Sequence, residues 1–104
     1  MNNSTSVTIF CEVVQVVEEQ VALSLAELCR CVGASAELVA ELVDHGLLTP
    51  LAGPGEGWRF GGSSLAVTRR AHRLMGDLGV NAAGAAVAIE LLDRIERLER
   101  GSRS

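Results

Sequence analysis

The sequence predicts a mainly helical protein, a winged helix-turn-helix followed by a C-terminal helix hairpin. Three observations predict it: two short capped helices meet at a tight turn, a Gly- and Pro-rich loop returns through an aromatic pair, and residues 69–98 repeat apolar side chains at helical spacing. We expect a single domain over residues 1–104, because this length supports one modest core. Its predicted parts are an N-terminal strand and loop (1–23), the winged helix-turn-helix (24–62), the helix hairpin (63–100) and a polar tail (101–104).

The N-terminal part predicts a strand over residues 6–14, because SVTIFCEVV is β-branched and partly alternating. The start of the chain is polar and has no basic segment, so we expect no signal peptide and a cytoplasmic location. Cys11, Cys29 and Cys31 are an odd number and cannot close a disulfide framework, which favours reduced structural thiols.

Two capped helices make up the helix-turn-helix. Ser24 followed three residues later by Glu27 has the spacing of a capping box, which predicts a helix over residues 25–32. Ser35 then caps a second helix over residues 36–45, and a glycine follows each helix. This pattern of two short helices around a glycine turn is typical of a helix-turn-helix.

The wing follows the second helix. Residues 47–50 (LLTP) predict a short extended exit, and the glycines and proline of residues 51–57 predict a flexible loop. Residues 58–60 (WRF) predict the strand that returns from this loop. After a Gly-Gly break, either Ser63 or Ser64 is expected to cap the next helix.

The C-terminal hairpin shows the strongest periodicity. Residues 69–78 predict one helix, Gly79 its left-handed cap, and Asn81 the N-cap of a second helix. In the second helix, apolar or small residues recur every three or four positions, as in a coiled-coil seam: Gly84, Ala88, Leu91, Ile95 and Leu98. We expect this seam to pack against the first helix or a second copy of the chain, with Gly84 allowing close approach. The predicted packing residues are Leu74, Leu78, Gly84, Leu91 and Ile95.

Charge is divided unevenly along the chain. Residues 1–50 carry seven acids and one arginine, a net charge of −6, whereas residues 51–104 carry eight arginines and six acids, a net charge of +2. An acidic first half argues against nucleic acid and favours a basic protein partner.

The second helix of the helix-turn-helix predicts the partner-binding site. Its polar face presents Glu37, Glu41 and Asp44, beside His45, with no basic residue from 36 to 44. A DNA-reading helix needs Arg, Lys, Asn or Gln, so these carboxylates fit a basic protein helix better. The alternative is that they form an ordinary solvated helix face.

Two further features are candidates for partner contact. Arg69, Arg70 and Arg73 form a basic cluster, although Arg73 and Asp77 also have the spacing of a helical ion pair. Trp58 is the only tryptophan, and it is either an interface anchor or part of the core beneath the wing.

No enzymatic constellation is present in the sequence. The cysteines have no sequence-level base partner, and no Gly-rich phosphate loop joins a strand to a helix. Two isolated histidines do not supply the spacing of a zinc site. We therefore expect no enzyme activity, cofactor, metal or membrane association.

The order of these parts resembles the MerR superfamily, in residues 24–28, 39–50 (VAELVDHGLLTP) and 58–60. A narrower resemblance, from WRF through RRAHRLMGDLGVNAAGAAVAIELLDRIERL, is to the CbpM family of chaperone-modulatory proteins. It implies a regulator that binds the J-domain of a CbpA/DnaJ-like co-chaperone, keeps it from the Hsp70 chaperone DnaK, and suppresses its DNA binding. The alternative is a MerR-family DNA-binding transcriptional regulator. The resemblance leaves open a homodimer through the C-terminal helices.

Overall fold

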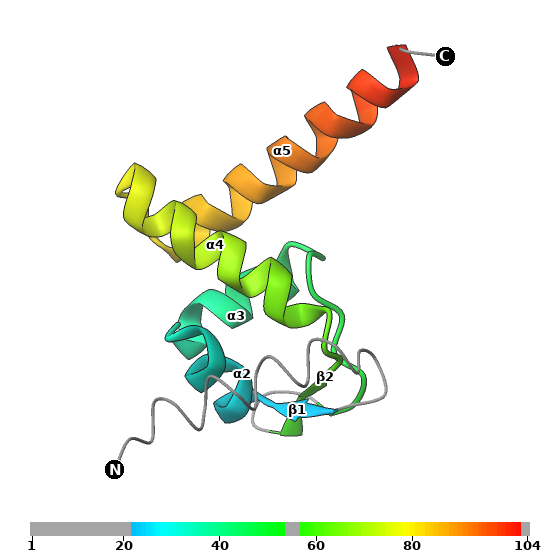
Figure 1. Cartoon of the computed structure of the whole chain (residues 1–104). Coiled ribbons are helices and arrows are strands. Elements are labelled where there is room, and N and C mark those ends of the chain that lie inside the picture. The colour runs from blue at the N-terminus through cyan, green and yellow to red at the C-terminus, as the bar shows by residue number, and fades with distance from the viewer. Residues whose placement is uncertain (1–21, 54–56, 103–104) are drawn as a thin grey trace.

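The computed structural model describes residues 22–53 and 57–102. In order, its elements are β1 (Leu23–Ser24), α2 (Leu25–Val32), α3 (Ala36–Asp44), β2 (Arg59–Phe60), α4 (Ser64–Leu78) and α5 (Ala82–Ser102). The described part is mainly helical, as predicted, and α5 extends from the remaining helices as a long rod (Figure 1). The strand predicted over residues 6–14 lies outside the described residues.

The capping box at the start of α2 is confirmed. The Glu27 backbone N–H donates to Ser24 Oγ at 3.1 Å, and the Ser24 N–H donates to the Glu27 carboxylate at 2.9 Å. Gly33 ends the helix in the left-handed conformation, with φ 80°. Local sequence is enough to define this helix, because each capping group lies within one turn of its partner.

The second helix is also confirmed, with a shorter end than predicted. The Leu38 N–H donates to Ser35 Oγ at 3.2 Å, so Ser35 is the N-cap. The helix ends at Asp44 rather than at residue 45, because His45 is already the C-cap. Leu38, Val39 and Leu42 are fully buried on one side.

The wing is held by a minimal sheet. β1 pairs antiparallel with β2, with Leu23 opposite Phe60 and Ser24 opposite Arg59. The predicted return strand is therefore present at Arg59–Phe60, and a further bridge joins Arg59 to Ala52 across the loop. Pairing with β1 ties the wing to the residue that caps α2.

Both ends of α4 lie where the sequence predicts them. Ser63 is the N-cap residue, although its side chain makes no capping hydrogen bond. Gly79 adopts the left-handed cap, with φ 69°, as predicted. At the start of α5, the Gly84 N–H donates to Asn81 Oδ1 at 2.8 Å, which confirms Asn81 as the N-cap.

One core joins all the elements. Its largest fully buried side chains are Phe60, Leu23, Leu28, Leu38, Leu42 and Leu65. From α5 it receives four residues that recur at helical spacing, Ala82, Ala85, Ala86 and Ile89, at most 3% exposed. The Thr68 hydroxyl is buried in this core with no hydrogen-bond partner among the described residues.

The predicted packing of the helix hairpin is partly wrong. The chain turns by 112° between α4 and α5, short of the reversal in an antiparallel pair, so α5 soon leaves α4 (Figure 1). Leu78, Leu91 and Ile95 are therefore 58%, 53% and 49% exposed and do not pack within the chain. Leu74 is half-buried against the core.

Gly84 does not mediate a close approach of α4 and α5. A Cβ added there would lie 3.0 Å from Val80 Cβ and 3.3 Å from Asn81 Oδ1. Its close neighbours thus belong to the turn that caps α5, and the predicted helix-helix contact at Gly84 is wrong within this chain.

Within the described ranges, no single helix has the length and apolar character needed to cross a membrane. In this part of the chain, α4 and α5 meet that requirement only when they are taken together across their bend, and by length and composition alone. Core helices of many soluble proteins meet it as well.

Candidate partner-binding site

The polar side of α3 carries three carboxylates. Glu37 and Asp44 are exposed and Glu41 is half-buried, while Leu38 and Leu42 on the opposite side anchor the helix in the core. Because buried residues fix the rotation of α3, its acidic side faces away from the core. The structure therefore brings the predicted acidic residues together on one accessible face.

His45 connects this acidic face to α5. Its Nδ1 lies 3.0 Å from Glu90 Oε1, and its Nε2 lies 3.7 Å from Glu41 Oε1. The imidazole is thus held between a carboxylate of α3 and one from α5. Glu90 was not among the predicted site residues, because no local pattern signals a contact between residues 45 positions apart.

We define the acidic surface as the following residues: Glu37, Glu41, Asp44, His45 and Glu90. The side chains of His45 and Glu41 are 27% and 32% exposed and that of Glu90 is 51% exposed, so an approaching molecule can reach all three. Four carboxylates within two packed helices create a negative potential that attracts a cationic partner.

The predicted basic cluster on α4 is partly engaged within the chain. Arg70 Nη1 lies 3.5 Å from Asp93 Oδ1, so this arginine links α4 to α5. Arg69 is half-buried and Arg73 is exposed. The ion pair predicted between Arg73 and Asp77 is wrong, since the described part of the chain shows no ion pair between them.

Trp58 belongs to the wing's attachment rather than to an open surface. It is half-buried against the core, and its ring meets Phe60 edge-on at 5.8 Å with an interplanar angle of 72°. Next to it, Arg59 Nη1 donates to the Trp58 carbonyl at 2.9 Å. The wing's arginine is therefore folded onto its own backbone.

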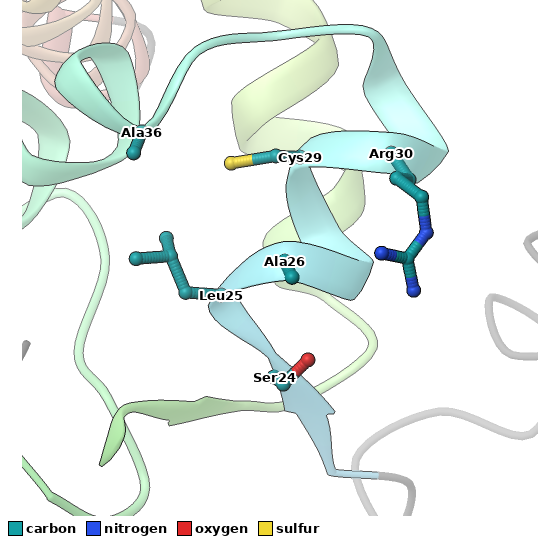
Figure 2. A pocket seen from close by; sticks show the side chains of 6 residues that line it. All are labelled: Ser24, Leu25, Ala26, Cys29, Arg30 and Ala36. Atoms are coloured by element: carbon teal, nitrogen blue, oxygen red, sulfur yellow. The ribbon is translucent and has the colours of Figure 1, made fainter. Parts of the chain in front are cut away.

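An open hollow lies between α2 and the start of α3. In Figure 2, Leu25 and the Cys29 sulfur point toward Ala36, while the Arg30 guanidinium lies on the other side of α2. Burial raises the pKa of the Cys29 thiol, which keeps it protonated and a poor nucleophile. Among the described residues, no group of three metal-ligating side chains is present.

The two cysteines within the described residues differ in state. Cys29 is a free thiol, as expected, whereas Cys31 is disulfide-bonded. The expectation of reduced thiols is therefore wrong for Cys31 in this structure.

A second accessible feature is an apolar stripe on α5. The outer stripe comprises Val87, Leu91, Ile95 and Leu98, which are 42%, 53%, 49% and 67% exposed. At about 100° per residue, these positions lie on the side of α5 opposite its buried alanines. The stripe is therefore a separate surface and does not continue the core.

A capped helix pair, a wing paired beside it, and a following helix pair define a regulatory protein of the MerR helix-turn-helix class. The family described as "MerR HTH family regulatory protein" matches residues 23–104, so the chain belongs to it. Within that class, the chain belongs to the CbpM family of chaperone modulatory proteins. The chaperone modulatory protein CbpM of Coxiella burnetii is 33% identical over 89 residues, which cover 86% of this chain and 84% of the relative.

A CbpM of Pseudomonas putida is 36% identical over 78 residues, which cover 75% of this chain and 77% of the relative. Both family descriptions name regulators rather than enzymes. A chaperone modulator acts by contacting another protein, which makes the acidic surface and the outer stripe the regions of functional interest.

Proposed function

We propose that this chain binds the J-domain of a CbpA/DnaJ-like co-chaperone through the acidic surface and thereby blocks its engagement of DnaK. The observation that supports this most directly is the absence of any basic residue from 36 to 44 in the helix that a DNA-binding relative would place in the major groove. A helix at that position with three carboxylates is suited to a cationic protein surface.

The basis of inhibition is competition for one surface of the partner. A J-domain presents a basic second helix followed by a His-Pro-Asp loop, as the family resemblance implies. Carboxylates from α3 and α5 complement such a helix, and α3 laid along it covers the side that DnaK contacts. Occlusion requires no covalent chemistry, which agrees with a non-enzymatic regulator that needs no cofactor.

Direct DNA binding is the competing function, and the arrangement of charges disfavours it. Glu37 and Asp44 would face phosphates, and two arginines of the wing and α4 already have partners within the chain. Arg59 donates to backbone carbonyls of the wing, and Arg70 pairs with Asp93. A DNA-binding protein relies on free arginines and lysines to displace counterions from phosphates.

The test is calorimetry with an isolated CbpA-type J-domain at low and moderate salt. We expect saturable one-to-one binding that weakens as salt screens the charges. Charge reversal in Glu37→Arg or Glu41→Arg should weaken binding by about tenfold or more, because a carboxylate that faces a cation becomes a like charge.

The matched control is Glu99→Arg, an equal change in net charge at an exposed position of α5 outside the acidic surface. Equal affinity for Glu37→Arg, Glu41→Arg and wild type, with no salt dependence, would exclude the acidic surface. No saturable binding at any salt concentration, combined with retention on duplex DNA, would favour the transcriptional regulator.

We further propose a homodimer in which the outer stripes of two α5 helices pack together. Leu91, Ile95 and Leu98 repeat at spacings of four and three, as residues of a coiled-coil seam do. They are large, apolar and about half exposed or more, which is unfavourable in a chain with no partner.

We also propose that the protein is cytoplasmic, as the sequence predicts.

A further inference from the structure

We propose that His45, held between Glu41 and Glu90, makes the acidic surface a proton-sensitive docking site that releases its cationic partner on acidification. This inference rests on the proposed function, because it concerns the regulation of the same surface. It draws on a contact between α3 and α5, and on the position of that contact at the centre of the carboxylates.

The geometry gives the two protonation states of the ring different contacts. In the neutral ring, Nδ1–H donates to Glu90 Oε1 across 3.0 Å, and Nε2 is a bare acceptor 3.7 Å from the Glu41 carboxylate. A proton taken up from solvent at Nε2 turns both nitrogens into donors. The cationic ring then pairs with Glu41 and Glu90 together.

The charge available to a partner changes accordingly. With His45 neutral, the acidic surface carries four carboxylates and no cation of its own, and the ring donates one hydrogen bond to Glu90. With His45 protonated, the surface already contains one cation, which competes for two of the four carboxylates. Because histidine side chains change charge near neutral pH, a modest acidification is enough to drive this exchange.

Among the described residues, the ion pairs of the ring are with carboxylates alone. From α3, it faces Glu41, with Asp44 next in the chain, and from α5 it faces Glu90, with Arg94 one turn further along. α4 also packs against α3, but in the described part of the chain it forms no ion pair with His45.

By linkage, partner binding and protonation oppose each other, so binding should release protons from the complex. Affinity of the wild-type chain for the J-domain should fall about three- to tenfold between about pH 7.5 and about pH 5.5. Calorimetry in two buffers of different ionisation enthalpy, near about pH 6.5, measures the protons released.

The J-domain has its own titrating histidine, so the decisive measurement compares variants of this chain against one J-domain. His45→Gln should retain binding at the higher pH and lose most of its pH dependence and proton release. His72→Gln is the matched control, because His72 is the other histidine of the chain and is exposed on α4. It should behave as wild type.

Glu90→Gln supplies a second variant that keeps His45 itself unchanged. It should weaken binding at the higher pH and reduce the pH dependence, because the protonated ring loses its shorter contact. Circular dichroism establishes that each variant is folded.

Equal pH dependence in wild type and His45→Gln would overturn this inference while leaving the proposed function intact. The absence of saturable binding at both pH values would overturn the proposed function, and this inference with it.

Discussion

α5 has two apolar faces, and the structure treats them in opposite ways. The inner face, Ala82, Ala85, Ala86 and Ile89, is at most 3% exposed, whereas the outer stripe is 42–67% exposed. The face with the smaller side chains is the one that enters the core. Alanine is favoured there because α5 crosses α3 and α4 closely, and a larger side chain would hold the helices apart.

The contrast shows that side-chain size and hydrophobicity predict different things. Leucine and isoleucine at coiled-coil spacing indicate a helix surface that needs a partner, without saying which molecule provides it. Alanines at the same spacing indicate a close crossing inside the chain. The sequence left the leucine seam open between the hairpin and a second copy of the chain, and the structure assigns the hairpin contact to the alanines.

Among substitutions that test the difference between the two faces, the largest loss of stability is expected on the inner face. Ala86→Asp places an unpaired carboxylate at a fully buried position, so we expect a loss of about 3–5 kcal/mol in the free energy of unfolding. Ala83→Asp is the matched control, because Ala83 is exposed in the first turn of α5, where a negative charge is favoured. Urea denaturation measures both, and equal stability of the two variants would contradict the assignment of the faces.

The outer stripe should respond in the opposite manner. Leu91→Glu should leave the stability of the single chain within about 0.5 kcal/mol, because this side chain lies at an exposed position. It should weaken self-association by about tenfold or more, because a carboxylate is placed in the apolar interface between two copies. Sedimentation velocity over a concentration series measures this.

The control for self-association is Arg97→Glu, which changes charge at an exposed position outside the stripe. A wild-type chain that sediments as a monomer at all concentrations would remove the homodimer proposal and leave the stripe without a partner.

A smaller change in stability is expected at Thr68, a buried position of α4. Thr68 is fully buried in α4 and its hydroxyl has no hydrogen-bond partner among the described residues. Thr68→Val replaces the hydroxyl by a methyl of similar shape, so we expect a gain of about 1 kcal/mol in unfolding free energy. Thr68→Ser keeps the hydroxyl and loses a methyl, so its melting temperature should fall. A lower melting temperature for Thr68→Val would show that the hydroxyl is satisfied.

The smallest effect is expected for the ion pair that joins α4 to α5. Arg70 and Asp93 have side chains 40% and 37% exposed at 3.5 Å separation, so solvent screens their attraction. Arg70→Gln should therefore change the unfolding free energy by less than about 0.5 kcal/mol. A larger loss in thermal unfolding would mean that this pair, rather than the inner face, fixes the crossing of the helices.

Features encoded within one helical turn were predictable from the sequence. Ser24 with Glu27, Ser35, Gly79 and Asn81 all adopt the capping roles that their residue types predict, because the partner group lies three or four positions away. Contacts between distant elements were not predictable. The link from His45 to Glu90 and that from Arg70 to Asp93 depend on the crossing angle of α5, which no local pattern specifies.

In the candidate site, too, features within one helix were predictable and contacts between elements were not. The three carboxylates of α3 were predicted because they repeat on one face of a single helix, and the structure keeps them accessible. For Trp58 the sequence allowed two roles, an interface anchor or a core residue. In the structure it packs on Phe60 at the edge of the core.

Beyond Ile89, α5 has no buried side chain from residue 90 to residue 101. Short helices without tertiary contacts are marginally stable in water, so amide protons in this half should exchange with solvent much faster than those of residues 82–89. Packing against a second copy would slow that exchange. The ratio of exchange rates between the two halves of one helix thus measures assembly residue by residue, without a label or a change in sequence.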